Sequence, residues 1–291
     1  MATVAQWVSG ARPWTLPAAL APVAAGTGAA AALHSMNGTR AGLALIVALA
    51  LQIGVNYAND YSDGIRGTDD RRTGPFRLTG SGAAQPGSVR TAAFGAFTVA
   101  GLAGLTLVAL CHIWWLLALG LACIAAAWFY TGGRRPYGYR GLGEVFVFLF
   151  FGLVAVLGTT YTQAGRSSLA ALCAAIGIGS LACAILVVNN LRDIPTDAVA
   201  GKRTLAVQLG EVRTRWLFVG LLLAAWLVVV PVVFTQPRVA LMFLALPLTV
   251  PPVRAVLRGA TGTALLPVLR ITGQLELAYG LLLGWSLYWR G

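Results

Sequence analysis

Long apolar runs constrain the fold of this chain more than any other feature of its sequence. There are nine of them, at residues 14–33, 41–59, 90–110, 113–131, 142–162, 168–190, 213–234, 239–257 and 268–289. Each has roughly the 20 residues that an α-helix needs to cross a bilayer. Charged residues make up only 10% of the chain, too few for the surface of a soluble domain. We therefore expect an all-α polytopic membrane protein with nine transmembrane helices, forming a single domain over residues 1–291.

The basic residues fall mainly on one side of these expected spans. All 21 Lys and Arg residues lie in the N-terminal segment or in connections after even-numbered runs, except Arg40, Arg166, Arg238 and Arg290. Because Lys and Arg accumulate in cytoplasmic loops, we expect the N-terminus in the cytoplasm of a multi-pass protein of the cell (inner or plasma) membrane. The net charge of +12 does not indicate nucleic-acid binding, since no basic stripe or RNA-binding motif accompanies it.

A first acidic cluster begins at the cytoplasmic end of the second run. It contains Asn56, Asn59, Asp60 and Asp63, and Asp69 follows. Asn59 and Asp63 are four residues apart, while Asp60 and Asp63 are three apart. On a helix, both spacings bring side chains to neighbouring positions. The cluster therefore presents several oxygen ligands at one helix end.

A second acidic cluster ends the sixth run with the same Asn-x-x-x-Asp spacing. Asn189 and Asp193 are four residues apart, and Asp197 follows after four more. Pro195 disfavours a helical conformation of the residue before it, so we expect Asp197 to lie beyond a break in the helix. Because both clusters follow even-numbered runs, we expect both on the cytoplasmic side of the membrane.

The repeated motif indicates two diverged halves, about 1–131 and 132–291, whose clusters face each other. Opposed carboxylate and amide oxygens suit Mg²⁺, which combines few protein carboxylates with substrate phosphate oxygens. Basic residues in the same connections suit a diphosphate. They are Arg66, Arg71, Arg72, Arg77, Arg192, Lys202 and Arg203. The residues alone leave three interpretations open: a metal–diphosphate site, a cation- or proton-coupled transporter, and unexceptional solvated loops.

The segments Asn59-Asp60-Tyr61-Ser62-Asp63 and Asp193-Ile194-Pro195-Thr196-Asp197 resemble the two acidic motifs of the UbiA superfamily of intramembrane aromatic prenyltransferases. The motifs, their separation and the apolar runs all match, so the resemblance covers nearly the whole chain. It implies helices around a central cavity and Mg²⁺-dependent transfer of a polyprenyl group from its diphosphate to an aromatic acceptor. A CDP-alcohol phosphotransferase is disfavoured, because the sequence after Asp63 lacks the continuation of that family's motif.

Other segments resemble one branch of this superfamily, the 1,4-dihydroxy-2-naphthoate polyprenyltransferases of menaquinone synthesis. They cover residues 11–17, 72–77, 130–139, 141–144 and 189–205. The resemblance implies that 1,4-dihydroxy-2-naphthoate is the acceptor, that CO₂ and diphosphate leave, and that demethylmenaquinone forms. The rival acceptor within the superfamily is 4-hydroxybenzoate. The alternative of a different class is a cation-coupled transporter, which would place its acids near mid-membrane rather than at one edge.

The resemblance also implies roles for individual residues. The catalytic Mg²⁺ ligands are Asp60, Asp63, Asp193 and Asp197, and the further metal candidates are Asn59, Asp69 and Asn189. The candidates for diphosphate binding are Arg12, Arg72, Arg134, Arg192 and Lys202. The candidates for contacts with the acceptor or the cavity are Asn56, Tyr130, Tyr139 and Glu144.

Two positions depart from the family pattern. Gly67 stands where a further Asp often follows the first motif, which leaves open which acids of the first cluster bind metal. Arg134 stands where the family has the Lys of a Tyr-x-x-x-Lys element. Arginine keeps the charge but presents a planar fork, so its geometry toward phosphate differs.

Overall fold

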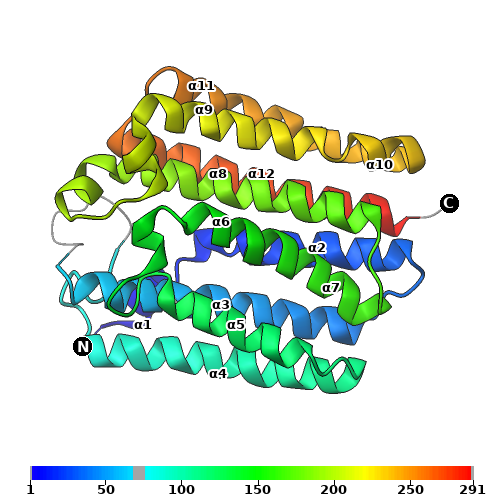
Figure 1. Cartoon of the computed structure of the whole chain (residues 1–291), viewed down its shortest axis with the longest axis horizontal. Coiled ribbons are helices and arrows are strands. Elements are labelled where there is room, and N and C mark those ends of the chain that lie inside the picture. The colour runs from blue at the N-terminus through cyan, green and yellow to red at the C-terminus, as the bar shows by residue number, and fades with distance from the viewer. Residues whose placement is uncertain (1, 68–75, 290–291) are drawn as a thin grey trace.

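The computed structural model describes residues 2–67 and 76–289, and every regular element in this part is helical. The long helices lie side by side in a bundle (Figure 1). In chain order the elements are α1 (Val4–Gly10), η1 (Pro13–Thr15), α2 (Pro17–Ala32), α3 (Gly38–Gly64), α4 (Pro86–Cys111), α5 (Leu116–Phe129), η2 (Tyr137–Arg140), α6 (Gly143–Val147), η3 (Phe148–Val154), α7 (Ala155–Ala164), α8 (Leu169–Val199), α9 (Leu205–Leu227), α10 (Val230–Thr235), η4 (Pro237–Thr249), α11 (Val250–Leu257), η5 (Gly262–Leu265) and α12 (Leu266–Tyr288). The expected all-α class is confirmed.

Six helical stretches within the described ranges are long and apolar enough to cross a membrane, or seven if one bent pair forms a single span. The six are Gly38–Gly64, Pro86–Cys111, Gly143–Ala164, Leu169–Val199, Leu205–Thr235 and Pro237–Leu257. The bent pair joins Val4–Thr15 to Pro17–Ala32 at 48°. The expected number of nine is not confirmed. One remaining run forms α5, which has only 14 residues and a length of about 21 Å. The other forms α12, whose Arg270 and Glu276 lower its mean hydropathy.

An apolar core shared by α2, α8, α9 and α12 fills one side of the bundle. Its helices approach closely because glycines face each other. A Cβ added to Gly28 of α2 would lie 2.2 Å from the carbonyl oxygen of Gly284 on α12, and small residues permit such contacts in membranes. Tyr279 of α12 ties the core to α9 by donating to the carbonyl of Ala225 at 2.7 Å. Residues of α2, α8 and α12 on this packed side wall one face of a central cavity, and α3, α4, α5 and α7 wall the other.

The expected break at Pro195 is wrong, because α8 continues through it to Val199. Proline removes one backbone donor, the one that would bond to the carbonyl of Leu191, and α8 keeps its helical course without that bond. The Thr196 hydroxyl donates to the carbonyl of Asp193 at 3.0 Å, and the amide of Lys202 donates to that of Asp197 at 2.9 Å. Asp197 therefore lies one helical turn beyond Asp193.

The fifth apolar run contains a π-helical segment, η3, between α6 and α7. Gly152 within it packs on Gly179 of α8, where an added Cβ would lie 2.6 Å from the Gly179 Cα. Phe150 and Phe151 of η3 line the central cavity. The widened turn thus places two aromatic rings on the cavity wall while the helix stays close to α8.

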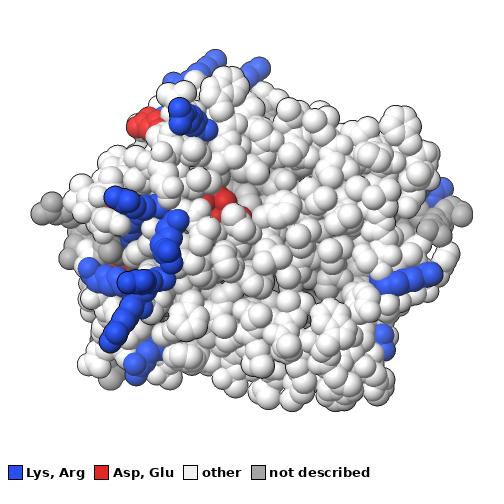
Figure 2. Space-filling model, viewed as in Figure 1, with Lys and Arg blue, Asp and Glu red and all other residues white. Residues whose placement is uncertain are grey.

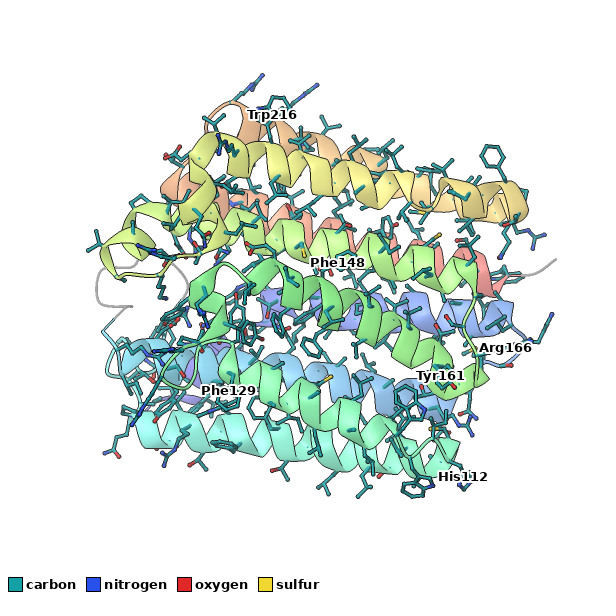
Figure 3. The ribbon with its side chains drawn as sticks, viewed as in Figure 1. His112, Phe129, Phe148, Tyr161, Arg166 and Trp216 are labelled. Carbon is teal, nitrogen blue, oxygen red and sulfur yellow. The ribbon has the colours of Figure 1, made fainter. Side chains whose placement is uncertain are left out.

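The two ends of the bundle differ in charge. On the face in Figure 2, most Lys and Arg side chains gather at one end, and the surface beyond them is largely uncharged. This is the end at which α3 and α8 finish (Figure 1). His112, Tyr161 and Arg166 lie at the opposite end (Figure 3). A bundle charged at one end and apolar along its length fits an integral membrane protein.

Candidate functional site

A central cavity of about 1090 Å³ lies between the bundle's two sides. Its walls are mainly apolar and come from α2, α3, α4, α5, η3, α7, α8 and α12. The polar lining residues include most of the predicted site. Among them are Arg12, Asn56, Asn59, Asp63, Arg77, Tyr130, Tyr139, Asn189, Asn190, Arg192, Asp193, Asp197 and Lys202.

Asp63 stands where segments from distant parts of the chain converge. The Lys202 ammonium lies 3.3 Å from its Oδ1, and a guanidinium nitrogen of Arg77 lies 3.8 Å from its Oδ2. The Tyr139 hydroxyl donates a hydrogen bond to Oδ1. The side chain of Asp63 is only 5% exposed, so these charges interact away from bulk water.

Lys202 joins the two acidic motifs. Its ammonium contacts Asp63 of α3 and also lies 4.0 Å from Oδ1 of Asp197 on α8. The same nitrogen sits 4.6 Å from the ring centre of Tyr139, a cation–π geometry. The expectation that the two clusters face each other is thus met in the geometry, and one buried cation lies between them.

The second motif carries its own counter-charge. Arg192 donates from Nε and Nη2 to the two carboxylate oxygens of Asp193, at 2.7 and 2.8 Å. Its Nη2 also donates to Asn189 at 2.9 Å. The third nitrogen, Nη1, is buried without a hydrogen bond in the described part of the chain. Because Arg192 lines the cavity, this nitrogen is a donor suited to an anionic ligand.

Asn59 is held in place by the connection that follows α5. Thr131 donates from its hydroxyl to the side-chain oxygen of Asn59 at 2.8 Å. Arg66 in turn donates to the backbone carbonyls of Thr131 and Gly133. The end of α3 and the start of this connection are therefore fixed to each other at the polar end of the cavity.

Asp60 does not share the cavity with Asp63. It is 0% exposed, and among the described residues that line the cavity it is absent. Its Oδ2 accepts from the backbone amide of Leu78 at 2.7 Å, and its Oδ1 accepts from that of Thr79 at 2.9 Å. This geometry argues against the prediction that Asp60 ligates a metal.

The N-terminal segment closes another part of the polar wall. Arg12 lines the cavity from a left-handed backbone conformation, φ 54°, that non-glycine residues seldom adopt. The Thr15 amide and hydroxyl both donate to its carbonyl, each at 2.9 Å. Asn56 of α3 donates to Thr15 and to the carbonyl of Ala11, each at 2.9 Å. The amide nitrogen of Asn56 is therefore engaged in holding this turn.

Some predicted residues lie elsewhere. Arg134 lines a separate outer pocket with Arg135, Arg140 and Arg203, and is not among the described residues of the central cavity. Glu144 is buried beside the cavity wall and accepts from Asn190 at 3.0 Å. Asp69 and Arg72 fall outside the residues that the structure describes.

The sequence interpretation missed three contributors to the site. The sequence marks Arg77 only as one of the basic residues near the first motif, although it belongs to the same segment as Arg72. Thr131 had no motif of its own. Tyr137 lines the cavity and donates to the carbonyl of Ala126 at 2.8 Å. Burial raises the pKa of the Tyr137 phenol, which therefore stays neutral and forms part of the cavity wall.

The donor set fits Mg²⁺ bound together with a diphosphate. No group of three or more His, Cys, Asp or Glu among the described residues is gathered closely enough to hold a metal alone. Mg²⁺ does not need such a cage, because one or two carboxylates with water and phosphate oxygens complete its octahedron. Asp63 and Asp197 approach the same ammonium, and Asn59 and Asn189 add amide oxygens. These are hard oxygen donors of the kind that Mg²⁺ requires.

Comparison with known proteins shows what the whole chain is similar to. The model of the UbiA prenyltransferase family matches residues 19–288. A Mycobacterium tuberculosis protein named 1,4-dihydroxy-2-naphthoate octaprenyltransferase is 57% identical over 281 residues, 97% of this chain and 96% of its own. An Escherichia coli protein of the same name is 39% identical, over 91% of this chain and 89% of its own. A UbiA homologue from Archaeoglobus fulgidus, solved with GPP and Mg²⁺, has a TM-score of 0.66 at 15% identity, over 97% of this chain and 99% of that one.

Proposed function

Since the chain belongs to the UbiA prenyltransferase family, we propose that it transfers a polyprenyl group from polyprenyl diphosphate to 1,4-dihydroxy-2-naphthoate at the polar end of its cavity. The protein is a membrane prenyltransferase. The naphthoate acceptor is supported by the names of the two bacterial relatives, which align with nearly the whole chain. Diphosphate and CO₂ leave, and the product is demethylmenaquinone in its reduced, quinol form.

One observation carries this proposal: Lys202 is buried between Asp63 and Asp197 at the polar end of an otherwise apolar cavity. Asp63, Asp193 and Asp197 would hold Mg²⁺, with oxygens from Asn59 and Asn189. When bound, Mg²⁺ supplies positive charge that offsets the charge growing on the leaving diphosphate. A site with opposed carboxylates and buried cations suits Mg²⁺ together with a diphosphate, and it offers few favourable contacts to a neutral ligand.

The chain's own cations bind and orient the diphosphate. Lys202, Arg192 and Arg77 face the cavity beside the acids, and Arg192 keeps a buried donor for an oxygen of the substrate. Fixed donors of this kind stabilise a leaving anion without having to reorganise during the reaction. Arg12 lines the same cavity and contributes a further cation.

The apolar wall protects the reacting carbon from water. As the C–O bond breaks, its electron pair goes to the diphosphate and leaves an electron-poor allylic carbon. Phe150 and Phe151 of η3 and Tyr137 line this region, so hydrolysis is excluded. The carboxylated ring carbon then supplies the electron pair for the new C–C bond. The pair left by departing CO₂ restores the ring, so no further reactant is needed.

The active site would open to the cytoplasm, with the N-terminus on the same side. The gathering of basic side chains at this end supports the orientation (Figure 2). Cysteine labelling tests it, in a variant whose four native cysteines are replaced. Arg140→Cys and Arg166→Cys, both at exposed positions, should be labelled from opposite sides of the membrane. Labelling of both from one side would overturn this orientation.

The reaction is tested by supplying polyprenyl diphosphate, Mg²⁺ and carboxyl-labelled 1,4-dihydroxy-2-naphthoate to the purified protein in lipid. We expect diphosphate and labelled CO₂ in equal amounts, with a matched assay using 4-hydroxybenzoate giving no product. Asp63→Ala and Asp193→Ala should abolish turnover. Glu211→Ala, which removes a half-exposed acid outside both motifs, should not. Turnover of 4-hydroxybenzoate alone would refute the acceptor, and full activity of both Asp variants would refute the site.

A further inference from the structure

Asp60 is fully buried beside the acids of the site, yet its carboxylate contacts a loop and not the cavity. It lies on α3, three residues before Asp63, with 0% of its surface exposed. Its two carboxylate oxygens accept from consecutive backbone amides, those of Leu78 and Thr79, at 2.7 and 2.9 Å. A carboxylate that accepts two amide hydrogen bonds makes charge-assisted contacts on both oxygens. Its hydrogen-bonding capacity is therefore directed at the backbone of the loop.

The loop at residues 76–80 is seated on α3 by shape as well as by these bonds. Leu78 is 0% exposed and packs against Gly10, where an added Cβ would lie 2.6 Å from a Leu78 methyl group. Thr79 packs on Gly64, where an added Cβ would lie 2.5 Å from the Thr79 Cβ. Two glycines, Gly10 at the end of α1 and Gly64 at the end of α3, thus leave room for the loop and fix its position against both helices.

This seating sets the position of Arg77. Residue 77 immediately precedes the two amides that Asp60 holds, and its guanidinium reaches 3.8 Å from Oδ2 of Asp63. Arg77 also lines the central cavity, while Leu78 and Thr79 do not belong to its described lining. Neighbouring acids of one motif therefore act on neighbouring residues of one loop: Asp60 holds the backbone, and Asp63 contacts the side chain.

We propose that Asp60 is a positioning residue, which fixes Arg77 at the polar end of the cavity as a contact for the substrate's diphosphate. It is not a ligand of the metal. The inference rests on the proposed function for the identity of the anion. It divides the first acidic motif into a metal-binding position, Asp63, and a loop-anchoring position, Asp60.

The first test separates diphosphate binding from metal binding. It uses geranyl diphosphate as the probe, and binding is measured at increasing Mg²⁺ without any aromatic acceptor. Asp60→Asn keeps one acceptor but places an amide N–H₂ against a backbone N–H. It should weaken geranyl diphosphate binding by roughly tenfold or more, the effect of losing a hydrogen bond to a charged group. The Mg²⁺ concentration for half-saturation should stay within about twofold of the parent. Asp63→Asn is the matched comparison and should raise that concentration.

The second test asks whether Asp60 acts through Arg77. Arg77→Ala should weaken geranyl diphosphate binding about as much as Asp60→Asn. The double variant should have about the same affinity as the single variant that binds less tightly. Asp60→Glu, which keeps the charge and both acceptors, should restore part of the affinity. If the losses of affinity in the two single variants multiply in the double variant, the two residues act independently and the proposal is overturned. A change in the Mg²⁺ dependence of Asp60→Asn equal to that of Asp63→Asn would also overturn it.

A third measurement needs no ligand and guards against a variant that fails to fold. Hydrogen exchange of the peptide covering residues 76–85 should speed up in Asp60→Asn and stay unchanged in Arg77→Ala, with protection elsewhere in α3 retained. Unchanged exchange in Asp60→Asn would overturn the anchoring role. If the parent protein binds geranyl diphosphate but prenylates no naphthoate, the proposed function fails at its acceptor, and all three measurements remain decisive for Asp60.

Discussion

The two acidic motifs share a spacing and a position at a helix end, yet they use their carboxylates differently. In the first, on α3, Asp60 holds a loop while Asp63 contacts groups from η2, from the loop at residues 76–80 and from the connection after α8. In the second, on α8, Asp193 is paired with Arg192, its neighbour in the sequence. The spacing fixes the positions of the carboxylates on their helices, and the partners of each carboxylate determine its role.

The difference is one of sequence separation. Asp63 depends on Tyr139, 76 residues away, and on Lys202, 139 residues away. Its other cation, Arg77, lies in the loop at residues 76–80, so all three of these partners reach Asp63 from outside α3. Asp193 carries its counter-charge on the same helix and needs no such outside partner. We infer that the second motif is a preformed half-site, and that the first is completed by tertiary contacts.

The largest expected effect comes from removing the group that joins the motifs. Lys202→Ala leaves Asp63 and Asp197 without their shared cation and removes a buried donor for the diphosphate. We expect kcat/KM to fall by roughly 10³-fold, as for the loss of a fixed charge at a leaving anion. The control is Arg203→Ala at the next residue, whose side chain is exposed and outside the central cavity. Equal losses in the two variants would mean that overall basicity matters rather than this bridge.

The next effect tests the claim that the second motif is preformed. Asp193→Asn leaves Arg192 buried at 5% exposure without a carboxylate, a situation that costs about 3–5 kcal/mol. In Asp63→Asn, Lys202 still has Asp197, so the loss of stability should be smaller. Thermal unfolding in detergent should therefore place the Asp193→Asn midpoint well below that of Asp63→Asn. The reverse order would contradict the distinction between the two half-sites.

A smaller effect separates the two roles of Tyr139 at the first motif. Tyr139→Phe removes the hydrogen bond to Asp63 but keeps the ring beneath Lys202. We expect about a tenfold loss of kcat/KM, and a further loss in Tyr139→Ala, which also removes the ring. Tyr137→Phe is the matched control, because its hydroxyl donates to the carbonyl of Ala126 and not to an acidic motif. A loss in Tyr137→Phe as large as in Tyr139→Phe would show that any phenol in this wall matters.

Much of this arrangement could be predicted from the sequence, because it follows from periodicity and topology. Apolar runs of spanning length predict a helical bundle, and equal spacing after even-numbered runs predicts that both motifs lie at one end. The meeting of Asp63 with Asp197 through Lys202 needs little more than that. The division into halves at about 1–131 and 132–291 stays a prediction.

The remaining features of the site depend on contacts that leave no recognisable pattern in the sequence. Asp60 bonds to backbone amides, which every residue but proline offers, so nothing in the sequence marks Leu78 and Thr79 as its partners. The family's Tyr-x-x-x-Lys element implies a diphosphate contact for Arg134, but Arg134 lines the outer pocket instead. Pro195 predicts a break in α8, but the helix continues through it to Val199.

The smallest expected effect concerns Asn59, the first-motif counterpart of Asn189. Each amide oxygen accepts one bond: Asn59 from Thr131 at 2.8 Å, and Asn189 from Arg192 at 2.9 Å. The first partner is neutral and the second is charged, so the first bond is worth about 1 kcal/mol. Thr131→Val removes it at nearly constant shape and should raise the Mg²⁺ requirement only a few-fold, about the factor that 1 kcal/mol allows. Thr131→Ser keeps the hydroxyl and should behave as the parent. If Thr131→Val matched Lys202→Ala in its effect, Asn59 would be a central ligand rather than a supporting one, and the first motif would not depend chiefly on Asp63.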